Sequence, residues 1–252
     1  MKREIVETAD GSFTFKIEGA QECFHSTNGA YTESMHIYIK NGLKYYIDNI
    51  LKSTKLQTAH INILDIGFGT GLNCILTAVA VEEQRGITIN YNAIEKYPLS
   101  IEEFELLNYK TLLANPSSHN INMIHTCSWA QKEKIEENFF LKKIKCDIKD
   151  LELNNSTKEI THRPVQLIDN NLANIVYFDA FSPNIQPQLW SVDIFKGLYN
   201  LMSDNSILVT YSAKGDVKRA LREAGFNVTR KEGPPGKRHI TVARKVINTL
   251  GK

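Results

Sequence analysis

Residues 61–73 read INILDIGFGTGLN, an apolar run that leads into three closely spaced glycines, Gly67, Gly69 and Gly71. A second apolar segment, LNCILTAVAV, begins within this stretch and is expected to form a helix. Glycine permits positive φ angles and close backbone approach, and the first turn of a helix offers free N–H groups. The segment therefore predicts a strand, a glycine loop that holds a ligand, and a helix.

The spacing of these glycines restricts the class of ligand that the loop can bind. A dinucleotide-binding fingerprint, GxGxxG, would place its last glycine where this chain has Leu72, which disfavours NAD. Asp65 precedes the loop, and the next predicted strand, ITINYNAIEK, carries Glu95 near its end, where an acid can accept hydrogen bonds from ribose hydroxyls. This arrangement is typical of class I methyltransferases that use S-adenosyl-L-methionine.

A cofactor site follows from this pattern. A third acid is expected near the adenine, and Asp147, after the predicted strand LKKIKC, is favoured over Asp150. Phe68 either faces the cofactor or packs in the protein. The predicted cofactor-binding residues are Asp65, Gly67, Phe68, Gly69, Gly71, Asn73, Glu95 and Asp147.

From residue 61 onward, apolar strands alternate with helical segments, which predicts an α/β fold with a doubly wound, mostly parallel sheet. FNVTRKE and HITVARKV read as a closing antiparallel pair, whereas WAQKEKIEENFF at residues 129–140 reads as an amphipathic helix. A polar stretch that ends in NNLAN follows the predicted strand LKKIKC. Residues 1–45 read as a small N-terminal β extension, and residues 46–252 as one Rossmann-like domain.

A second acidic strand end occurs in VYFDAFSPNIQPQLW at residues 176–190. Asp179 follows an apolar strand, and Pro183 and Pro187 exclude a continuing helix or central strand. A carboxylate at the C-terminal end of a strand, under a stiff loop, is how an α/β enzyme presents a polar group to a ligand.

Composition restricts the class of protein. The chain has 252 residues and a net charge of +2, with no apolar run long enough to span a membrane and no signal peptide, so a cytoplasmic protein is expected. Its four cysteines are scattered, which argues against a metal site. Residues 214–245 hold ten Lys or Arg against three acids, a net +7 that suits either phosphate binding or a solvated surface.

Four motifs carry a specific resemblance: LDIGFGTGLN, YFDAFSPNIQPQLW, TYSAKGDVKRALREAGF and GPPGKRHITVARK. They resemble the tRNA 5-aminomethyluridine methyltransferases, known as one half of the bifunctional MnmC and as stand-alone MnmD proteins. The resemblance implies methylation of 5-aminomethyl(-2-thio)uridine at the wobble position, with the tRNA anticodon loop as partner. It also implies a class I methyltransferase fold, no FAD-dependent oxidoreductase domain, and separate upstream enzymes that make the aminomethyl group.

The same resemblance implies that Asp179 is catalytic. An alkyl amine has a pKa near ~10, so the site must hold the neutral form, and Asp179 is expected to position the amine and accept its proton. The substrate-binding residues predicted are Phe181, Trp190, Tyr211, Lys237 and Arg238.

The segment FHSTNGAYTES at residues 24–34 carries His25, Asn28 and Glu33, which either help to close the site or simply form a turn. Two other functions fit the same residues: a methyltransferase or aminopropyltransferase acting on a free small amine, and an RNA-binding module without catalytic activity.

Overall fold

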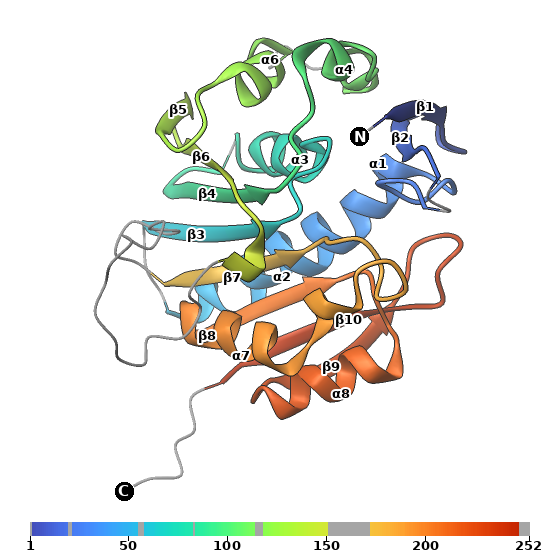
Figure 1. Cartoon of the computed structure of the whole chain (residues 1–252). Coiled ribbons are helices and arrows are strands. Elements are labelled where there is room, and N and C mark those ends of the chain that lie inside the picture. Colours follow the sequence, from blue (N-terminus) through green and yellow to red (C-terminus); the bar gives the residue numbers. More distant parts are fainter. Residues whose placement is uncertain are drawn as a thin grey trace, which may run out of the picture.

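A computed structural model describes residues 2–19, 22–54, 58–82, 84–113, 118–150 and 172–246. An eight-stranded sheet forms its centre, in the order β5-β6-β4-β3-β7-β8-β10-β9 (Figure 1). The five strands from β6 to β8 in this order run parallel, and β5, β10 and β9 pair antiparallel at the two edges. The α/β fold with a mostly parallel sheet and a closing antiparallel pair, expected from the sequence, is thus confirmed. The strands are β3 (Ala59–Ile66), β4 (Ile87–Glu95), β5 (Lys132–Glu136), β6 (Phe139–Lys145), β7 (Ala173–Phe178), β8 (Met202–Thr210), β9 (Asn227–Glu232) and β10 (His239–Lys245).

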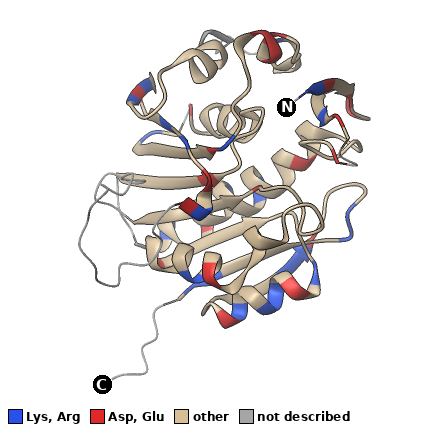
Figure 2. Cartoon of the chain, in the orientation of Figure 1, with Lys and Arg blue, Asp and Glu red and all other residues tan. Residues whose placement is uncertain are grey.

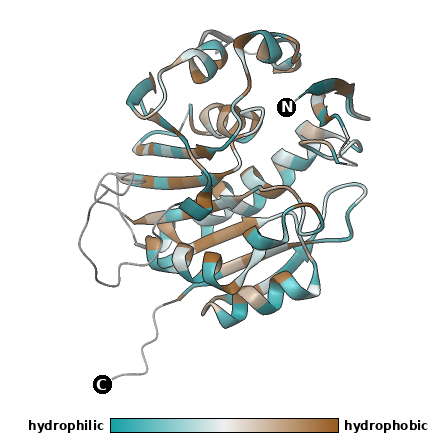
Figure 3. Cartoon of the chain, viewed as in Figure 1, coloured by the Kyte–Doolittle hydropathy of each residue, from teal (hydrophilic) through white to brown (hydrophobic). Residues whose placement is uncertain are grey.

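The sheet separates two hydrophobic cores, because successive side chains along a strand point to opposite faces. Ile63 and Tyr177 belong to one core, and their neighbours Leu64 and Phe178 belong to the other. The strands of the sheet interior are accordingly the most hydrophobic part of the chain in Figure 3. The first core is covered by α1 (Ala30–Ser34), η1 (Met35–Lys44), α2 (Tyr45–Asn49), α3 (Leu72–Val81) and α6 (Ser118–Thr126), and the second by α7 (Val192–Leu201) and α8 (Gly215–Glu223).

The N-terminal region is only partly the β extension that was predicted. A hairpin does form from β1 (Arg3–Glu7) and β2 (Phe13–Ile17), but α1, η1 and α2 follow as one continuous helix, with the wider turns of a π-helix in its middle. The predicted boundary at residue 45 therefore falls inside a helix. The alternation MHIYIK suggested a strand, but burial against the sheet of the apolar residues of η1, among them Tyr38, stabilises the helix instead.

The hairpin is held against the start of this helix by hydrogen bonds to one carboxylate. Asp10 accepts from the backbone N–H of Thr32 at 2.8 Å and from the hydroxyls of Thr8 and Ser12 at 2.8 and 2.5 Å. Free N–H groups in the first turn of a helix are stabilised by such an acceptor. Asp10 therefore fixes the segment between hairpin and helix, which lies beside the functional cavity described below.

Residues 129–140 form a β-hairpin rather than the predicted helix. β5 and β6 are joined through Glu137 and Asn138, and Phe139 and Leu141 are fully buried while Phe140 is not. The alternating burial identifies a strand, and the many charges in the segment lie on the exposed edge strand β5. Two short helices follow β4, α4 (Ile101–Glu105) and α5 (Tyr109–Leu112). The polar stretch at residues 151–171 lies outside the described residues.

Candidate functional site

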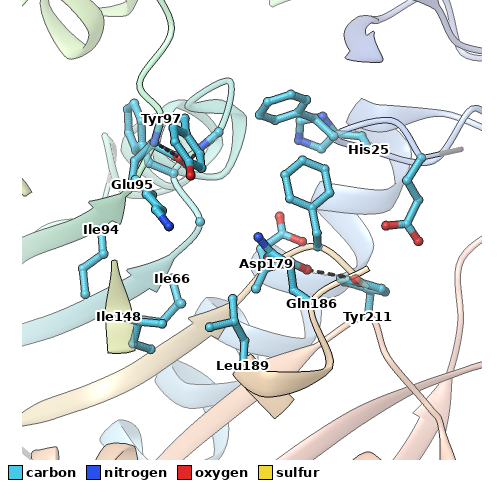
Figure 4. A pocket seen from close by; sticks show the side chains of 18 of the residues that line it. His25, Ile66, Ile94, Glu95, Tyr97, Ile148, Asp179, Gln186, Leu189 and Tyr211 are labelled. Atoms are coloured by element: carbon cyan, nitrogen blue, oxygen red, sulfur yellow. Dashed lines mark hydrogen bonds between the residues drawn. The ribbon is translucent and has the colours of Figure 1, made fainter. Parts of the chain in front are cut away.

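A cavity of about 390 Å³ opens at the C-terminal ends of β3, β4, β6 and β7, which is where open α/β sheets bind ligands. Figure 4 shows the apolar residues Ile66, Ile94, Ile148 and Leu189 and the acid Glu95 on one side, and Asp179 and Tyr211 on the other. The cavity thus has an apolar end with acids at its rim and a separate polar end. Nine predicted site residues line it: Gly67, Phe68, Gly69, Glu95, Asp147, Asp179, Phe181, Tyr211 and Lys237.

The glycine loop joins β3 to α3 with unusual backbone angles. Gly67 has a φ of +96°, and a Cβ at this position would lie 2.6 Å from the carbonyl oxygen of Asp179. Gly71 has a φ of +76° and caps the N-terminus of α3, and a Cβ there would lie 2.7 Å from Nε2 of His125. Both glycines are therefore required by close contacts within the protein, and Gly67 also holds the loop against Asp179.

We expect Gly67→Ala to abolish the loop geometry. The positive φ and the overlap with the Asp179 carbonyl together should cost about 2–4 kcal/mol of unfolding free energy. They should also weaken binding of S-adenosyl-L-homocysteine, the demethylated form of the cofactor that the sequence predicts, at least ~10-fold. Gly19→Ala is the matched control, because Gly19 has a φ of +80° with no atom within 4 Å of a Cβ. Thermal denaturation and calorimetry should show only the backbone strain in the control. Equal losses in both variants would contradict the proposed role of the close contact.

Glu95, at the end of β4, organises the loop from the side. Its Oε2 accepts the backbone N–H of Gly69 at 2.9 Å, and its Oε1 accepts the backbone N–H of Tyr97 at 2.7 Å. Each carboxylate oxygen has a second lone pair, so both can still accept a hydrogen bond from a ligand in the cavity. Glu95 therefore has the geometry to hold a pair of hydroxyl groups.

Asp147 follows β6 and lines the apolar end of the cavity. Its carboxylate accepts from Lys96 Nζ at 3.0 Å and from the backbone N–H of Lys149 at 3.0 Å. Burial opposes the charge, but these hydrogen bonds and the two lysine charges outweigh it and lower the pKa of Asp147. Asp150 is exposed and does not line the cavity, so the geometry favours Asp147 as the third acid.

Asp179 lies at the polar end, directly after β7. Asn73 Nδ2 donates to Asp179 Oδ2 at 2.8 Å, and the hydroxyl of Tyr38 lies close by. Burial raises the pKa of Asp179 to about 6; the charge of Glu33 adds to this effect, while Tyr38, Asn73 and Lys237 act in the opposite direction. The carboxylate is consequently ionised at neutral pH and is a stronger base than an ordinary aspartate.

A second carboxylate, Glu33 on α1, faces the same end of the cavity. It accepts the backbone N–H of Ser26 at 2.9 Å and a hydrogen bond from Lys237 Nζ. Lys237 Nζ also lies 4.3 Å from the centre of the Tyr211 ring, whose hydroxyl donates to the carbonyl of Ala180 at 2.9 Å. These contacts connect the loop at residues 233–238 with the N-terminal segment over Asp179.

Five predicted site residues do not line the cavity: Asp65, Gly71, Asn73, Trp190 and Arg238. Asp65 is completely buried beneath the loop, where it accepts from the Tyr91 hydroxyl at 2.7 Å, and burial raises the pKa of Asp65 well above its usual value. Asn73 does not line the cavity, but it donates a hydrogen bond to Asp179, which does.

Two predicted aromatic residues, Trp190 and Phe68, differ in their relation to the cavity. Trp190 is buried between Phe178 and Tyr211 and donates its Nε1–H to the carbonyl of Phe181 at 2.9 Å, so it stabilises the proline loop instead of facing a ligand. Phe68 borders the cavity, but its ring is 5% exposed and packs against His125 and Trp129. Arg238 is exposed and does not line the cavity, whereas its neighbour Lys237 does.

Sequence reasoning missed Tyr38, because the segment that carries it was expected to be a strand. His25, which was considered with Glu33, does line the cavity and shares a hydrogen bond with Thr14 Oγ1 at 2.9 Å. Burial lowers the pKa of His25 to about 4, so the imidazole is neutral at physiological pH.

Among the described residues, no three His, Cys, Asp or Glu side chains are grouped closely enough to hold a metal ion. The same part of the chain contains no helix with the length and hydrophobicity needed to cross a membrane.

Comparison with known proteins bears on the class of enzyme. A family model described as S-adenosyl-L-methionine-dependent methyltransferase matches residues 124–246. The crystal structure of MnmC2 from Aquifex aeolicus superposes with a TM-score of 0.66 at 25% sequence identity, over 96% of this chain and 70% of that one. The bifunctional MnmC of Burkholderia multivorans is 26% identical over 88% of this chain. Residues 124–246 thus match the S-adenosyl-L-methionine-dependent methyltransferase family model, and nearly the whole chain shares the fold of MnmC2. The protein is an enzyme of the methyltransferase class, with S-adenosyl-L-methionine as its cofactor.

Two further similar proteins show what the similarity in sequence and in fold covers. An uncharacterized protein of Methanocaldococcus jannaschii is 30% identical over 97% of the methyltransferase chain. A spermidine synthase superposes with a TM-score of 0.52 at 13% identity, over 98% of this chain and 70% of that one, and thus shares the fold. The chain spans 60% of the Methanocaldococcus protein and 32% of the Burkholderia MnmC, so it corresponds to only part of these relatives.

Proposed function

We propose that this methyltransferase converts 5-aminomethyluridine, with or without 2-thiolation, at the wobble position of tRNA to 5-methylaminomethyluridine. The observation that carries the proposal is the placement of Asp179, with a pKa of about 6, at the polar end of the cavity beside Glu33. Carboxylates at this place suit a nucleophile with N–H groups. The printed names of MnmC relatives, which concern biosynthesis of 5-methylaminomethyl-2-thiouridine in tRNA, support this choice of substrate.

The residues present fit the cofactor. Glu95 has free lone pairs for the ribose hydroxyls, Asp147 suits the adenine amino group, and Ile94 and Ile148 provide apolar surfaces for the ring. The predicted Gly67 and Gly69 form the wall between this end and Asp179. When bound, S-adenosyl-L-methionine supplies a methyl group on sulfur that is transferred to the amine nitrogen as the S–C bond electrons return to sulfur.

Asp179 has two tasks in this reaction. Its Oδ2 is held by Asn73, which leaves the other oxygen to accept an N–H of the substrate amine and so orient the nitrogen lone pair. After transfer, the nitrogen is a secondary ammonium, and its proton leaves through Asp179 or to water. Phe181 and Tyr211 line the same end and can contact a base that is turned out of a single-stranded loop.

A cluster of cations lies outside the cavity, next to the loop that carries Lys237. Lys218 of α8, Arg230 of β9 and Arg238 all act on His239, whose pKa is lowered by desolvation and then by these three charges. Figure 2 shows Lys and Arg gathered on α8 and on the β9–β10 end of the molecule. We assign tRNA phosphates to this cluster of Lys218, Arg230 and Arg238, and Lys237 to the cavity instead.

Charge reversal within this cluster tests the assignment. Lys218→Glu, Arg230→Glu and Arg238→Glu together should weaken tRNA binding and reduce the slope of log affinity against log salt concentration by about 2–3. Arg219→Glu is the control, because Arg219 is on the same helix but is already paired with Asp216. Filter binding between 50 and 300 mM salt measures both slopes, and an unchanged slope in the triple variant would remove this surface from the proposal.

The proposed reaction is tested directly with isotopically labelled S-adenosyl-L-methionine and tRNA that carries the aminomethyl group. Nucleoside analysis should reveal labelled 5-methylaminomethyluridine. Unmodified tRNA and free di- and polyamines are the comparison substrates. Labelling of a free amine without tRNA would favour the alternative, a methyltransferase or aminopropyltransferase for small amines. Binding of tRNA without turnover of any substrate would favour an RNA-binding module.

A further inference from the structure

The proposed substrate raises a problem of protonation that the cavity must solve. An alkyl amine with a pKa near ~10 is neutral in only about one molecule in a thousand at pH 7, and only the neutral form is a nucleophile. Asp179 and Glu33 both face the position expected for the amine, and Glu22 lies at its edge, where it accepts the backbone N–H of Ser182 at 3.1 Å. Acids that surround an amine stabilise its ammonium form, so these three would hold the substrate in its unreactive form.

The distribution of cations in the cavity is uneven. Its lining contains Lys96, Lys149 and Lys237 among the described residues, and the first two lie within 3.0 and 3.6 Å of Asp147 at the apolar end. Lys237 is thus the lysine of the polar end. Apart from the acids Asp179, Glu33 and Glu22, the titratable groups that face the polar end are uncharged, because burial lowers the pKa of His25 to about 4 and raises those of Tyr38 and Tyr211.

Lys237 is fixed in this position by contacts on several sides. It donates to Glu33 of α1, lies over the Tyr211 ring that follows β8, and is 29% exposed in its side chain. The turn that carries it is seated on the N-terminal segment, because a Cβ at Gly236 would lie 2.1 Å from Asn28 Nδ2. The His36 ring is also 2.9 Å from the carbonyl of Glu232. A flexible surface lysine would have none of these restraints.

We propose that Lys237, held between Glu33 and Tyr211 beside Asp179, offsets the negative charge of the polar end so that the aminomethyl nitrogen of the substrate binds there as the neutral nucleophile. The inference rests on the function proposed above. A fixed cation near an amine disfavours its ammonium form, as it does for reactive lysines in other enzymes. Lys237 is therefore a positioning and charge-setting residue, and the reacting bonds are those already described.

The pH dependence of single-turnover methylation separates this role from a structural one. At saturating S-adenosyl-L-methionine, between pH 6.5 and 10, the wild-type rate should rise with pH to a plateau. In Lys237→Met, the midpoint of the rise should move up by about one pH unit, with roughly a tenfold lower rate at pH 7 and recovery at high pH. In Glu33→Gln, which removes a negative charge, the midpoint should move down. Lys237→Arg keeps the charge and should keep the midpoint.

Calorimetry supplies a readout that does not depend on turnover. With S-adenosyl-L-homocysteine present, binding of aminomethyl-tRNA in buffers of different ionisation enthalpy reports the protons released. Lys237→Met should release fewer protons than the wild type, and Glu33→Gln should release more. If Lys237→Met fails to fold, Lys237→Gln and Glu33→Gln carry the same test.

The outcomes distinguish this inference from the proposed function. If the wild type leaves aminomethyl-tRNA unmethylated, the proposed function is wrong and the inference falls with it. If the wild type methylates this tRNA but the midpoint and the proton release are the same in all folded variants, the inference alone is overturned. Loss of activity by the same factor at every pH in both charge-removing variants would likewise assign Lys237 and Glu33 a structural role only.

Discussion

Asp179→Asn is expected to lower the methylation rate at pH 7.5 by about 10³-fold while leaving the affinity for S-adenosyl-L-methionine within about twofold. Asparagine preserves the size of the side chain and can still accept the hydrogen bond from Asn73 Nδ2. It presents at most one oxygen acceptor in place of two and carries no charge, so it can no longer both bind Asn73 and receive the substrate's N–H proton.

The same substitution should stabilise the fold. Because the pKa of Asp179 is raised from 3.8 to about 6, the folded protein binds a proton at this site more tightly than the unfolded chain does. Ionisation of Asp179 therefore costs folding free energy, which reaches about 1–3 kcal/mol above pH 6 and vanishes below pH 3.8. Thermal denaturation should show Asp179→Asn more stable than the wild type at pH 7.5, with the difference shrinking as the pH falls from 6 to 4.

Asp193→Asn provides the comparison, because Asp193 is exposed in the first turn of α7 and does not line the cavity. It should retain methylation and show no gain in stability. If Asp179→Asn were less stable than the wild type at pH 7.5, the carboxylate would have a structural role that outweighs its desolvation. If cofactor affinity fell in parallel with activity, Asp179 would belong to the cofactor-binding residues.

The position of Asp179 in the cavity could be predicted because of a general property of parallel sheets. Glu95, Asp147 and Asp179 each follow or end a strand that the sequence reveals by its apolar run, and the C-terminal ends of parallel strands meet at one edge. Once β4, β6 and β7 were recognised, convergence of the three acids required no knowledge of side-chain packing. Asp65 stands one residue before the end of β3, and the alternation of faces directs it into the core.

What could not be predicted depends on tertiary contacts in loops. Lys237 and Arg238 are adjacent and chemically alike, yet one pairs with Glu33 inside the cavity and the other is exposed. Their directions are set by the turn after Pro234 and by its contact with Asn28, more than 200 residues earlier. The helix at Ala30–Asn49 was missed for a related reason, since its alternating sequence fits a strand until the sheet below it is known. These two features together place Glu33, Tyr38 and Lys237 around Asp179.

Glu95→Gln is the second substitution with a large expected effect, and it acts on the cofactor. Glu95 accepts the backbone N–H groups of Gly69 and Tyr97 with its two oxygens, and no rotation of a glutamine amide can satisfy both. One N–H group would face the NH2 group of the new side chain, which disturbs the glycine loop as well as the hydroxyl-binding lone pairs. The affinity for S-adenosyl-L-homocysteine should fall about 100-fold, which corresponds to roughly 3 kcal/mol.

Glu105→Gln serves as its control, because Glu105 is exposed at the end of α4 and does not line the cavity. Calorimetry should find wild-type cofactor affinity in this variant, and filter binding should find unchanged tRNA affinity in both variants, since the cluster proposed to bind phosphates lies outside the cavity. Retention of cofactor affinity in Glu95→Gln would mean that the ribose is held by other groups and that Glu95 only supports the loop. A parallel loss of tRNA affinity would instead mean that the glycine loop and the RNA-binding surface are coupled, because the substitution itself changes only hydrogen bonds within the cavity.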